Sequence, residues 1–148
     1  MAIPVEAALA RYPVAQTSCF GDTPELTAEL LALVRSGRKR ATCTAAVEIG
    51  TAEVEPVPGR RDISLDAEGR AALVIETLRV VRLRFHEMTE EMALMEGEDE
   101  TLEGWREGHR RYWGRQGLFA PDMEILREEF RLVEDFAGAG EHPCSDAS

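Results

Sequence analysis

Residues 36–44 read SGRKRATCT and join a predicted helix to a predicted strand. The helix should begin at Pro24 and reach residue 36, because Thr23 is a good N-cap and proline is favoured in the first turn. Gly37 can adopt the left-handed conformation that ends many helices. The threonines that follow favour extended backbone. The stretch is therefore predicted to be a turn that feeds a strand.

Lys39 and Thr42 lie three residues apart on this turn, so their polar ends can point into one cleft. A threonine hydroxyl becomes a nucleophile when a base takes its proton, and a lysine can be that base if desolvation or nearby positive charge favours its neutral form. Arg38 and Arg40 flank the lysine and favour this chemistry. From spacing alone, a capped helix end is the simpler interpretation and a catalytic or anion-binding turn is the alternative.

The composition limits the class of protein. The chain has 148 residues, of which 44% are hydrophobic and 30% charged, and this fits one globular domain. The apolar runs are too short to cross a bilayer, and the first residues lack the basic region of a signal peptide. We therefore expect a cytoplasmic protein with no membrane partner. The net charge of −11 argues against binding to extended duplex DNA, but it leaves a small ligand open.

The three cysteines, Cys19, Cys43 and Cys144, are too scattered for a disulfide framework or a CxxC site. We expect free thiols, no metal and no cofactor. Cys43 adjoins Thr42, but no histidine is next to it in the sequence. A buried small hydrophobic residue is therefore the simpler interpretation.

Before and after the central turn, the pattern mixes helices and strands. Residues 4–12 favour a short helix that ends before a proline. Residues 41–49 favour a strand, and the glycines and prolines of 50–60 favour a loop in which residues 52–54 could form a short edge strand.

The second half of the chain begins with a predicted β-hairpin. Residues 62–65 and 71–85 flank a four-residue turn, and the second arm is long enough that it should bend. Residues 87–95 favour a short helix with its methionines on one side. The next helix should run from the N-cap Thr101 to Arg115, after an acidic turn that suits a helix N-terminus without any catalytic role.

Within this last helix, Trp105, His109 and Tyr112 share a face, and Arg106 borders it. A hydrogen-bonded core histidine is the simpler interpretation, with ligand stacking or proton transfer as the alternative. Residues 123–136 fit either a helix or a closing strand.

Three segments in this order resemble the ASCH domain family: FGDTPEL at 20–26, GRKRAT at 37–42, and EGE at 96–98 followed by TLEGWREGH at 101–109. The resemblance spans about residues 19–136. It leaves 1–18 as an N-terminal extension and 137–148 as a tail that we expect to be disordered. It implies an α+β, PUA-like fold, in which helices surround a small mixed β-barrel, and it implies that residues 123–136 form mostly a closing strand.

The resemblance also implies a partner, RNA or a modified nucleoside, bound in a cleft around Lys39 and Thr42. Some members resemble amidohydrolases that deacylate N4-acylcytidine with a lysine, a threonine and a glutamate. Matched by motif, these are Lys39, Thr42 and Glu98. Other members are ribonucleases, and a non-catalytic interaction scaffold is a further alternative. The sequence also leaves a homodimer open.

Two departures from the family pattern affect the expected site. The residue after the motif lysine is usually a small hydroxyl residue and here is Arg40. The acidic turn is one residue shorter than the commoner EGEGD form, so Glu96 is an alternative to Glu98 as the catalytic acid. Ligand binding is expected from four residues: Arg40, Trp105, Arg106 and His109.

Overall fold

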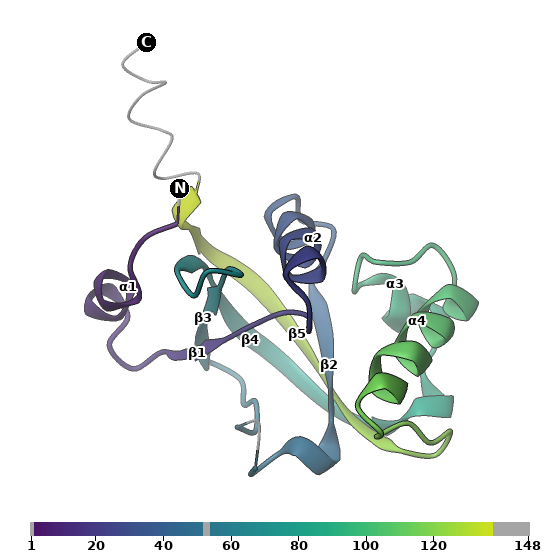
Figure 1. The fold of residues 1–148 in the computed structure, drawn as a ribbon. Coiled ribbons are helices and arrows are strands. Elements are labelled where there is room, and N and C mark those ends of the chain that lie inside the picture. Colours follow the sequence, from purple (N-terminus) through teal and green to yellow (C-terminus); the bar gives the residue numbers. More distant parts are fainter. Residues whose placement is uncertain (1, 52–53, 138–148) are drawn as a thin grey trace.

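A computed structural model describes residues 2–51 and 54–137 of the chain (Figure 1). The fold is α+β, and its centre is one five-stranded sheet that curves into a half-barrel, with strand order β1-β3-β4-β5-β2. The strands are β1 (Gln16–Ser18), β2 (Ala41–Ala45), β3 (Arg61–Leu65), β4 (Ala71–Arg84) and β5 (Glu124–Asp135). The helices are α1 (Val5–Arg11), α2 (Pro24–Arg35), α3 (Glu90–Leu94) and α4 (Leu102–Arg115), with short 3-10 turns η1 (Ala46–Glu48) and η2 (Phe85–Glu87).

The long antiparallel pair of β4 and β5 forms the spine of the sheet. It runs from Leu73 opposite Asp135 to Arg84 opposite Glu124. The register of β4 shifts twice, after residue 74 and between residues 77 and 79, and such bulges bend a strand. The predicted β3–β4 hairpin and the bend in its second arm are therefore confirmed.

Hydroxyl caps fix where the two longer helices begin. The Thr23 Oγ1 accepts a hydrogen bond from the Leu26 N–H at 3.1 Å, and the Thr101 Oγ1 accepts one from the Gly104 N–H at 3.0 Å. Gly37 has a φ of +83° just after α2, in the left-handed region that favours glycine. The helices predicted at 4–12, 24–36 and 101–115 are all present.

Two predicted elements are shorter than expected. The strand predicted at 41–49 ends at Ala45 and continues as η1. The helix predicted at 87–95 begins only at Glu90, because the Thr89 side chain caps it by accepting from the Met92 N–H at 3.2 Å. Residues 123–136 form mostly strand β5, as the family resemblance implied. Residues 52–53 of the edge strand considered at 52–54 lie outside the described residues, as does most of the tail, and Val54 is not in a strand.

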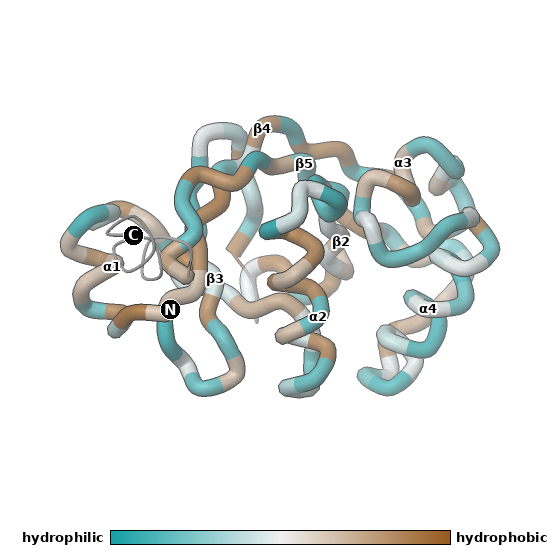
Figure 2. Tube along the Cα trace, turned by 90° about the horizontal axis from the view of Figure 1, so that it is seen from above, coloured by the Kyte–Doolittle hydropathy of each residue, from teal (hydrophilic) through white to brown (hydrophobic). Residues whose placement is uncertain are grey.

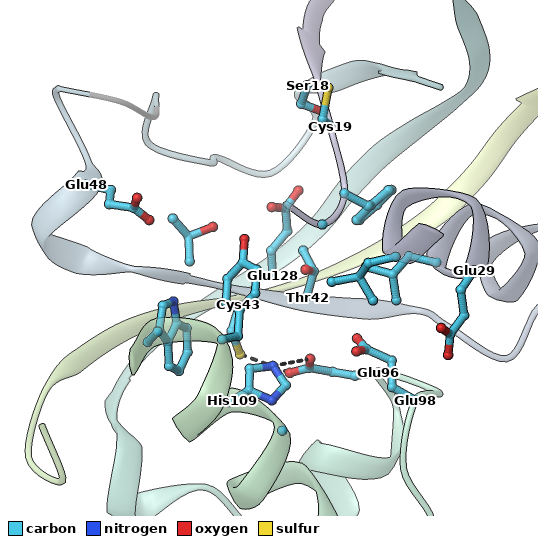
Figure 3. Close-up of a pocket in the computed structure, with 18 of the residues that line it drawn as sticks. Ser18, Cys19, Glu29, Thr42, Cys43, Glu48, Glu96, Glu98, His109 and Glu128 are labelled. Atoms are coloured by element: carbon cyan, nitrogen blue, oxygen red, sulfur yellow. Dashed lines mark hydrogen bonds and ion pairs between the residues drawn. The ribbon is translucent and has the colours of Figure 1, made fainter. Parts of the chain in front are cut away.

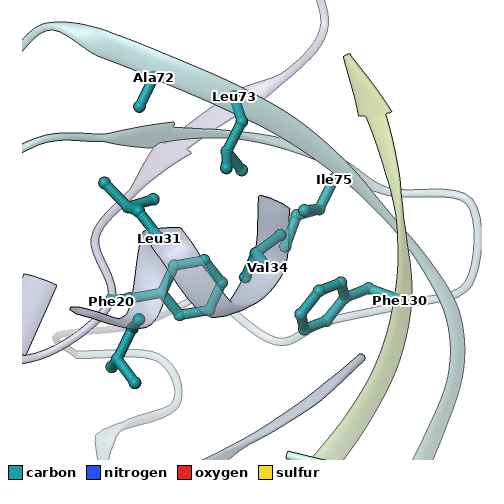
Figure 4. Close-up of a cluster of buried hydrophobic side chains, with 8 residues drawn as sticks. Phe20, Leu31, Val34, Ala72, Leu73, Ile75 and Phe130 are labelled. Atoms are coloured by element: carbon teal, nitrogen blue, oxygen red, sulfur yellow. The ribbon is translucent and has the colours of Figure 1, made fainter. Parts of the chain in front are cut away.

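One hydrophobic core lies between α2 and the sheet (Figure 4). Hydrophobic residues are concentrated along β4 and part of α2 (Figure 2). A second cluster places α4 against the other end of the sheet, with Trp105 stacked on Phe85 at a ring distance of 5.2 Å. The first core thus holds α2 against β4 and β5, and the second holds α4 against the end of the sheet that includes Ala45 of β2. No helix among the described residues has the length and apolar character needed to cross a membrane.

Candidate active site

The acidic turn before α4 packs directly against the turn between α2 and β2. Gly97 makes this contact with a φ of +76°, and a Cβ placed on it would lie 2.4 Å from the Arg38 carbonyl oxygen. Only glycine allows so close an approach to backbone. The approach brings Glu96 and Glu98, on either side of the glycine, to Lys39.

Lys39 is buried, with 1% of its side chain exposed. Its Nζ donates to the Glu98 Oε2 at 2.7 Å, to the Ala41 carbonyl at 3.0 Å and to the Glu96 carbonyl at 3.4 Å. Three acceptors therefore surround an ammonium that has three N–H donors. Arg38 and Arg40 are exposed, and the charged groups that contact the Lys39 ammonium are the carboxylates of Glu96 and Glu98.

Glu96 is a buried carboxylate held by three groups, and 1% of its side chain is exposed. Its Oε2 accepts from the Cys43 Sγ at 3.0 Å, and its Oε1 lies 3.3 Å from the His109 Nε2 (Figure 3). The same Oε1 lies 3.9 Å from the Lys39 Nζ. Burial would raise the pKa of Glu96, but the charges of His109 and Lys39 and the hydrogen bond from Cys43 outweigh it and lower the pKa to about 2.

His109 completes this buried network. Its Nδ1 lies 3.0 Å from the Trp105 carbonyl, and its ring stacks on the Trp105 indole at 4.2 Å. Burial would lower the pKa of His109, but the charge of Glu96 and its hydrogen bond raise it overall. With an acceptor beside each ring nitrogen, the imidazolium form is favoured.

Cys43 is not a suitable nucleophile in this network. Burial, followed by the nearby charge of Glu96, raises its pKa well above the ordinary value, so the thiol stays protonated and donates to the carboxylate. The sequence did not reveal this role, because Glu96 is 53 residues away from Cys43. Only the folded chain brings the two together.

A pocket of about 340 Å³ opens beside the network (Figure 3). Thr42, Cys43 and Thr44 of β2 form one wall, and Glu96, Glu98 and Asp99 form another. His109 and Tyr112 of α4 and Glu128 of β5 also line it. Its volume lies in the range of small-molecule sites, roughly 300–1,000 Å³.

The charge of the pocket is predominantly negative. Seven carboxylate residues line it: Glu29, Glu48, Asp62, Glu96, Glu98, Asp99 and Glu128. Its three arginines already have carboxylate partners in the chain: Arg60 with Asp62 at 2.8 Å, Arg111 with Glu107 at 3.2 Å, and Arg115 with Asp22 at 3.0 Å. A neutral or cationic ligand therefore suits the pocket better than a phosphate-rich one.

The structure brings some of the predicted site residues together and separates others. Thr42, Glu98, Glu96 and His109 line the pocket, and Lys39 lies directly behind Glu98. Trp105 is 0% exposed and its indole stacks on the His109 ring, so it is not available to stack on a ligand.

Arg40 and Arg106 do not line the pocket. Arg40 is exposed, and its backbone joins Met95 and Phe130. Arg106 pairs with Glu103 on its own helix at 3.3 Å. Their predicted ligand-binding roles therefore gain no support from the structure.

Replacing Gly97 with alanine should destabilise the protein by about 2–4 kcal/mol, because left-handed strain and a backbone clash add together. Urea denaturation would measure the change. Gly117→Ala is the matched control, since Gly117 has a similar φ of +73° but open space around the position of a Cβ. Equal losses in the two variants would show that the approach of Gly97 to Arg38 is unimportant.

The Glu96–His109 pair should make stability depend on pH. The lowered pKa of Glu96 gives stabilisation that is complete above about 4.5 and is lost as the pH falls toward 2. The raised pKa of His109 gives stabilisation that is complete below 6.5 and is lost as the pH rises through the raised value. Denaturation at a series of pH values should show the largest contribution between these limits, and His109→Gln should remove the decline on the alkaline side. A wild-type stability that does not fall above pH 6.5 would contradict this account.

The comparisons with known proteins agree with this fold. The ASCH domain family model matches residues 16–134, which is most of the chain. The chain belongs to the ASCH domain family. The resemblance seen in the sequence is thus confirmed, and the family is linked to RNA binding.

Two solved structures show the same fold. The ASCH domain from Lactobacillus crispatus is 24% identical, with a TM-score of 0.75, and the match covers 86% of this chain and 85% of that one. Protein EF3133 from Enterococcus faecalis is 29% identical, with a TM-score of 0.77, over 93% of this chain and 90% of that one. A comparison with curated proteins finds no match.

Proposed function

We propose that this ASCH protein is an amidohydrolase that removes the acyl group from N4-acylcytidine-like nucleosides. One observation carries the proposal. Thr42 and Glu98 line the same pocket, and the carboxylate of Glu98 is hydrogen-bonded to the buried Lys39. These are the three residues that match the motif of the deacylating relatives, and they come from two distant segments of the chain.

The contacts of Lys39 favour a division of roles that differs from the expected one. Because the Lys39 ammonium already donates to three acceptors, it has no lone pair with which to take a proton from Thr42. Glu98 is 23% exposed and its carboxylate can accept that proton. Lys39 then fixes the position of Glu98 and supplies positive charge near the reacting amide.

The proposed reaction has two steps. The Thr42 oxygen attacks the acyl carbon, its proton passes to Glu98, and the bond between this carbon and the exocyclic nitrogen breaks as Glu98 returns the proton to that nitrogen. Cytidine leaves, and the acyl group remains on Thr42 as an ester. Water then attacks the ester and gives its proton to Glu98, which passes a proton to the Thr42 oxygen as the carboxylic acid departs.

The charge of the pocket supports a nucleoside as the substrate. A nucleoside is neutral, so the carboxylates that line the pocket do not repel it. A polynucleotide would bring a phosphate for each residue of its chain, and the arginines at the pocket are already paired.

Chromatography of reaction mixtures tests the proposal. Purified protein is incubated with N4-acetylcytidine, with other N-acyl nucleosides and with a short RNA that carries N4-acetylcytidine. We expect cytidine and acetate from the nucleoside, slower reaction of the RNA, and unchanged activity in Thr51→Ala, which alters an exposed threonine outside the pocket. Absence of deacylation across the panel would overturn the proposal.

A further inference from the structure

Strand β2 is an edge of the sheet, because its only strand neighbour among the described residues is β5. The register is regular from Ala41 opposite Glu129 to Ala45 opposite Ile125. Along an antiparallel edge strand, every second residue directs its N–H and C=O toward the neighbour, and the residues between them direct theirs away.

The hydrogen bonds show which residues point outward. The Phe130 N–H donates to the Arg40 carbonyl at 3.0 Å, on one side of the pair formed by Ala41 and Glu129. Because Arg40 points its carbonyl toward β5, the alternation along the strand directs the N–H and C=O of Thr42 toward β5 as well. It directs those of Ala41 and Cys43 away from β5. The Ala41 carbonyl agrees, because it accepts from the Lys39 Nζ at 3.0 Å instead of from β5.

The outward N–H and C=O of Cys43 are therefore the next outward groups along this edge after those of Ala41, whose carbonyl binds Lys39. Outside the ladder between β2 and β5, no backbone–backbone hydrogen bond joins the Cys43 N–H or C=O to another of the described residues. Cys43 lines the pocket together with both of its neighbours in β2. A donor and an acceptor of one peptide edge thus remain available at the wall of the pocket.

We infer that the Cys43 backbone N–H and C=O bind the hydrogen-bonding edge of the nucleobase, as an added strand would bind the edge of a sheet. The inference rests on the proposed function and adds the means by which the base is recognised. In an N4-acylcytosine, the ring N3 accepts a hydrogen bond and the adjacent exocyclic N–H donates one. This pattern complements one outward residue of a strand: the Cys43 N–H donates to the ring N3, and the Cys43 C=O accepts from the exocyclic N–H.

A proline at position 43 tests the inference, because it removes the outward N–H and leaves the ladder to β5 intact. Proline is tolerated on edge strands when its nitrogen faces away from the neighbouring strand. Cys43→Ala is the matched control, since it lacks the side-chain donor toward Glu96, as proline does, but keeps the backbone N–H. Both variants also carry Thr42→Ala so that N4-acetylcytidine is not consumed, and affinities are measured by titration calorimetry.

We expect Cys43→Ala to bind N4-acetylcytidine within about twofold of the Thr42→Ala parent, and Cys43→Pro to bind it roughly five- to tenfold more weakly, the loss typical of one hydrogen bond. Amide hydrogen exchange in the parent, followed by NMR, covers the case of a proline variant that does not fold. Saturating ligand should slow exchange of the Cys43 amide and leave the amide at position 42 unchanged, because that amide already faces β5.

Two results would overturn the inference alone: equal affinities of the alanine and proline variants, or Cys43 exchange that stays unchanged while ligand is bound. If neither N4-acetylcytidine nor cytidine binds the parent at all, this inference and the proposed function both fail. The two failures are therefore distinguishable by whether the calorimeter detects binding.

Discussion

Replacing Thr42 with alanine should lower the turnover of N4-acetylcytidine by at least about 10³-fold, because the variant lacks the oxygen that forms the acyl ester. Thr42 is half-buried in β2 and lines the pocket beside Glu98, so loss of one methyl and one hydroxyl there should change folding little. Initial rates at saturating substrate would measure the change, with circular dichroism to show that the variant is folded.

Two further variants distinguish a nucleophile from a residue that only lines the pocket. Thr42→Ser keeps a hydroxyl and should retain measurable turnover. Thr44→Ala removes a second threonine from the same wall of the pocket and should change the KM more than the kcat. If Thr42→Ala keeps more than about a tenth of the wild-type kcat, nucleophilic catalysis by Thr42 is excluded.

Replacing Glu96 with alanine should destabilise the protein by about 3–5 kcal/mol, as expected when one partner is removed from a buried ion pair. Both Lys39 and His109 would remain buried with their positive charges, and the Cys43 thiol would lose its acceptor. Urea denaturation near pH 6 would measure the loss, since both charges of the pair are present there.

Glu98→Ala is the matched comparison for this prediction. Its carboxylate also binds Lys39, at 2.7 Å, but 23% of the side chain is exposed, so water can replace part of the interaction. We expect Glu98→Ala to lower the free energy of unfolding less than Glu96→Ala does. Relative to that loss of stability, it should lower the kcat far more. Equal destabilisation by the two variants would contradict the distinct roles that we give to the two glutamates.

Local sequence signals predicted most of the helices and the β3–β4 hairpin, because each depends on neighbouring residues. The caps at Thr23 and Thr101 and the glycine after α2 act within one turn of chain. Strand β5 was different. Its bulged pairing with β4 breaks the alternation of buried and exposed residues, so periodicity left helix and strand open and only the family resemblance favoured the strand.

The candidate site was predictable only in part, for reasons of geometry. The motif identified Lys39, Thr42 and Glu98, but nothing local shows that Lys39 is buried, since lysines are mostly exposed. Arg40 is its neighbour in the sequence, yet it lies on the exposed side of the chain, away from the pocket.

The contacts of Cys43 with Glu96 and its neighbours could not be predicted from the sequence either. It depends on contacts across more than fifty residues, made through the close approach of Gly97 to Arg38. Local patterns carry no information about such contacts.

A crystal structure of the Thr42→Ala variant with N4-acetylcytidine would show directly whether the pocket binds the substrate for attack by Thr42. The proposed mechanism requires the base to lie in the pocket lined by β2 and α4, with its acyl carbon facing position 42 and close to the Glu98 carboxylate. A ligand bound elsewhere, or bound with its sugar against Glu98 and its acyl group in solvent, would contradict it.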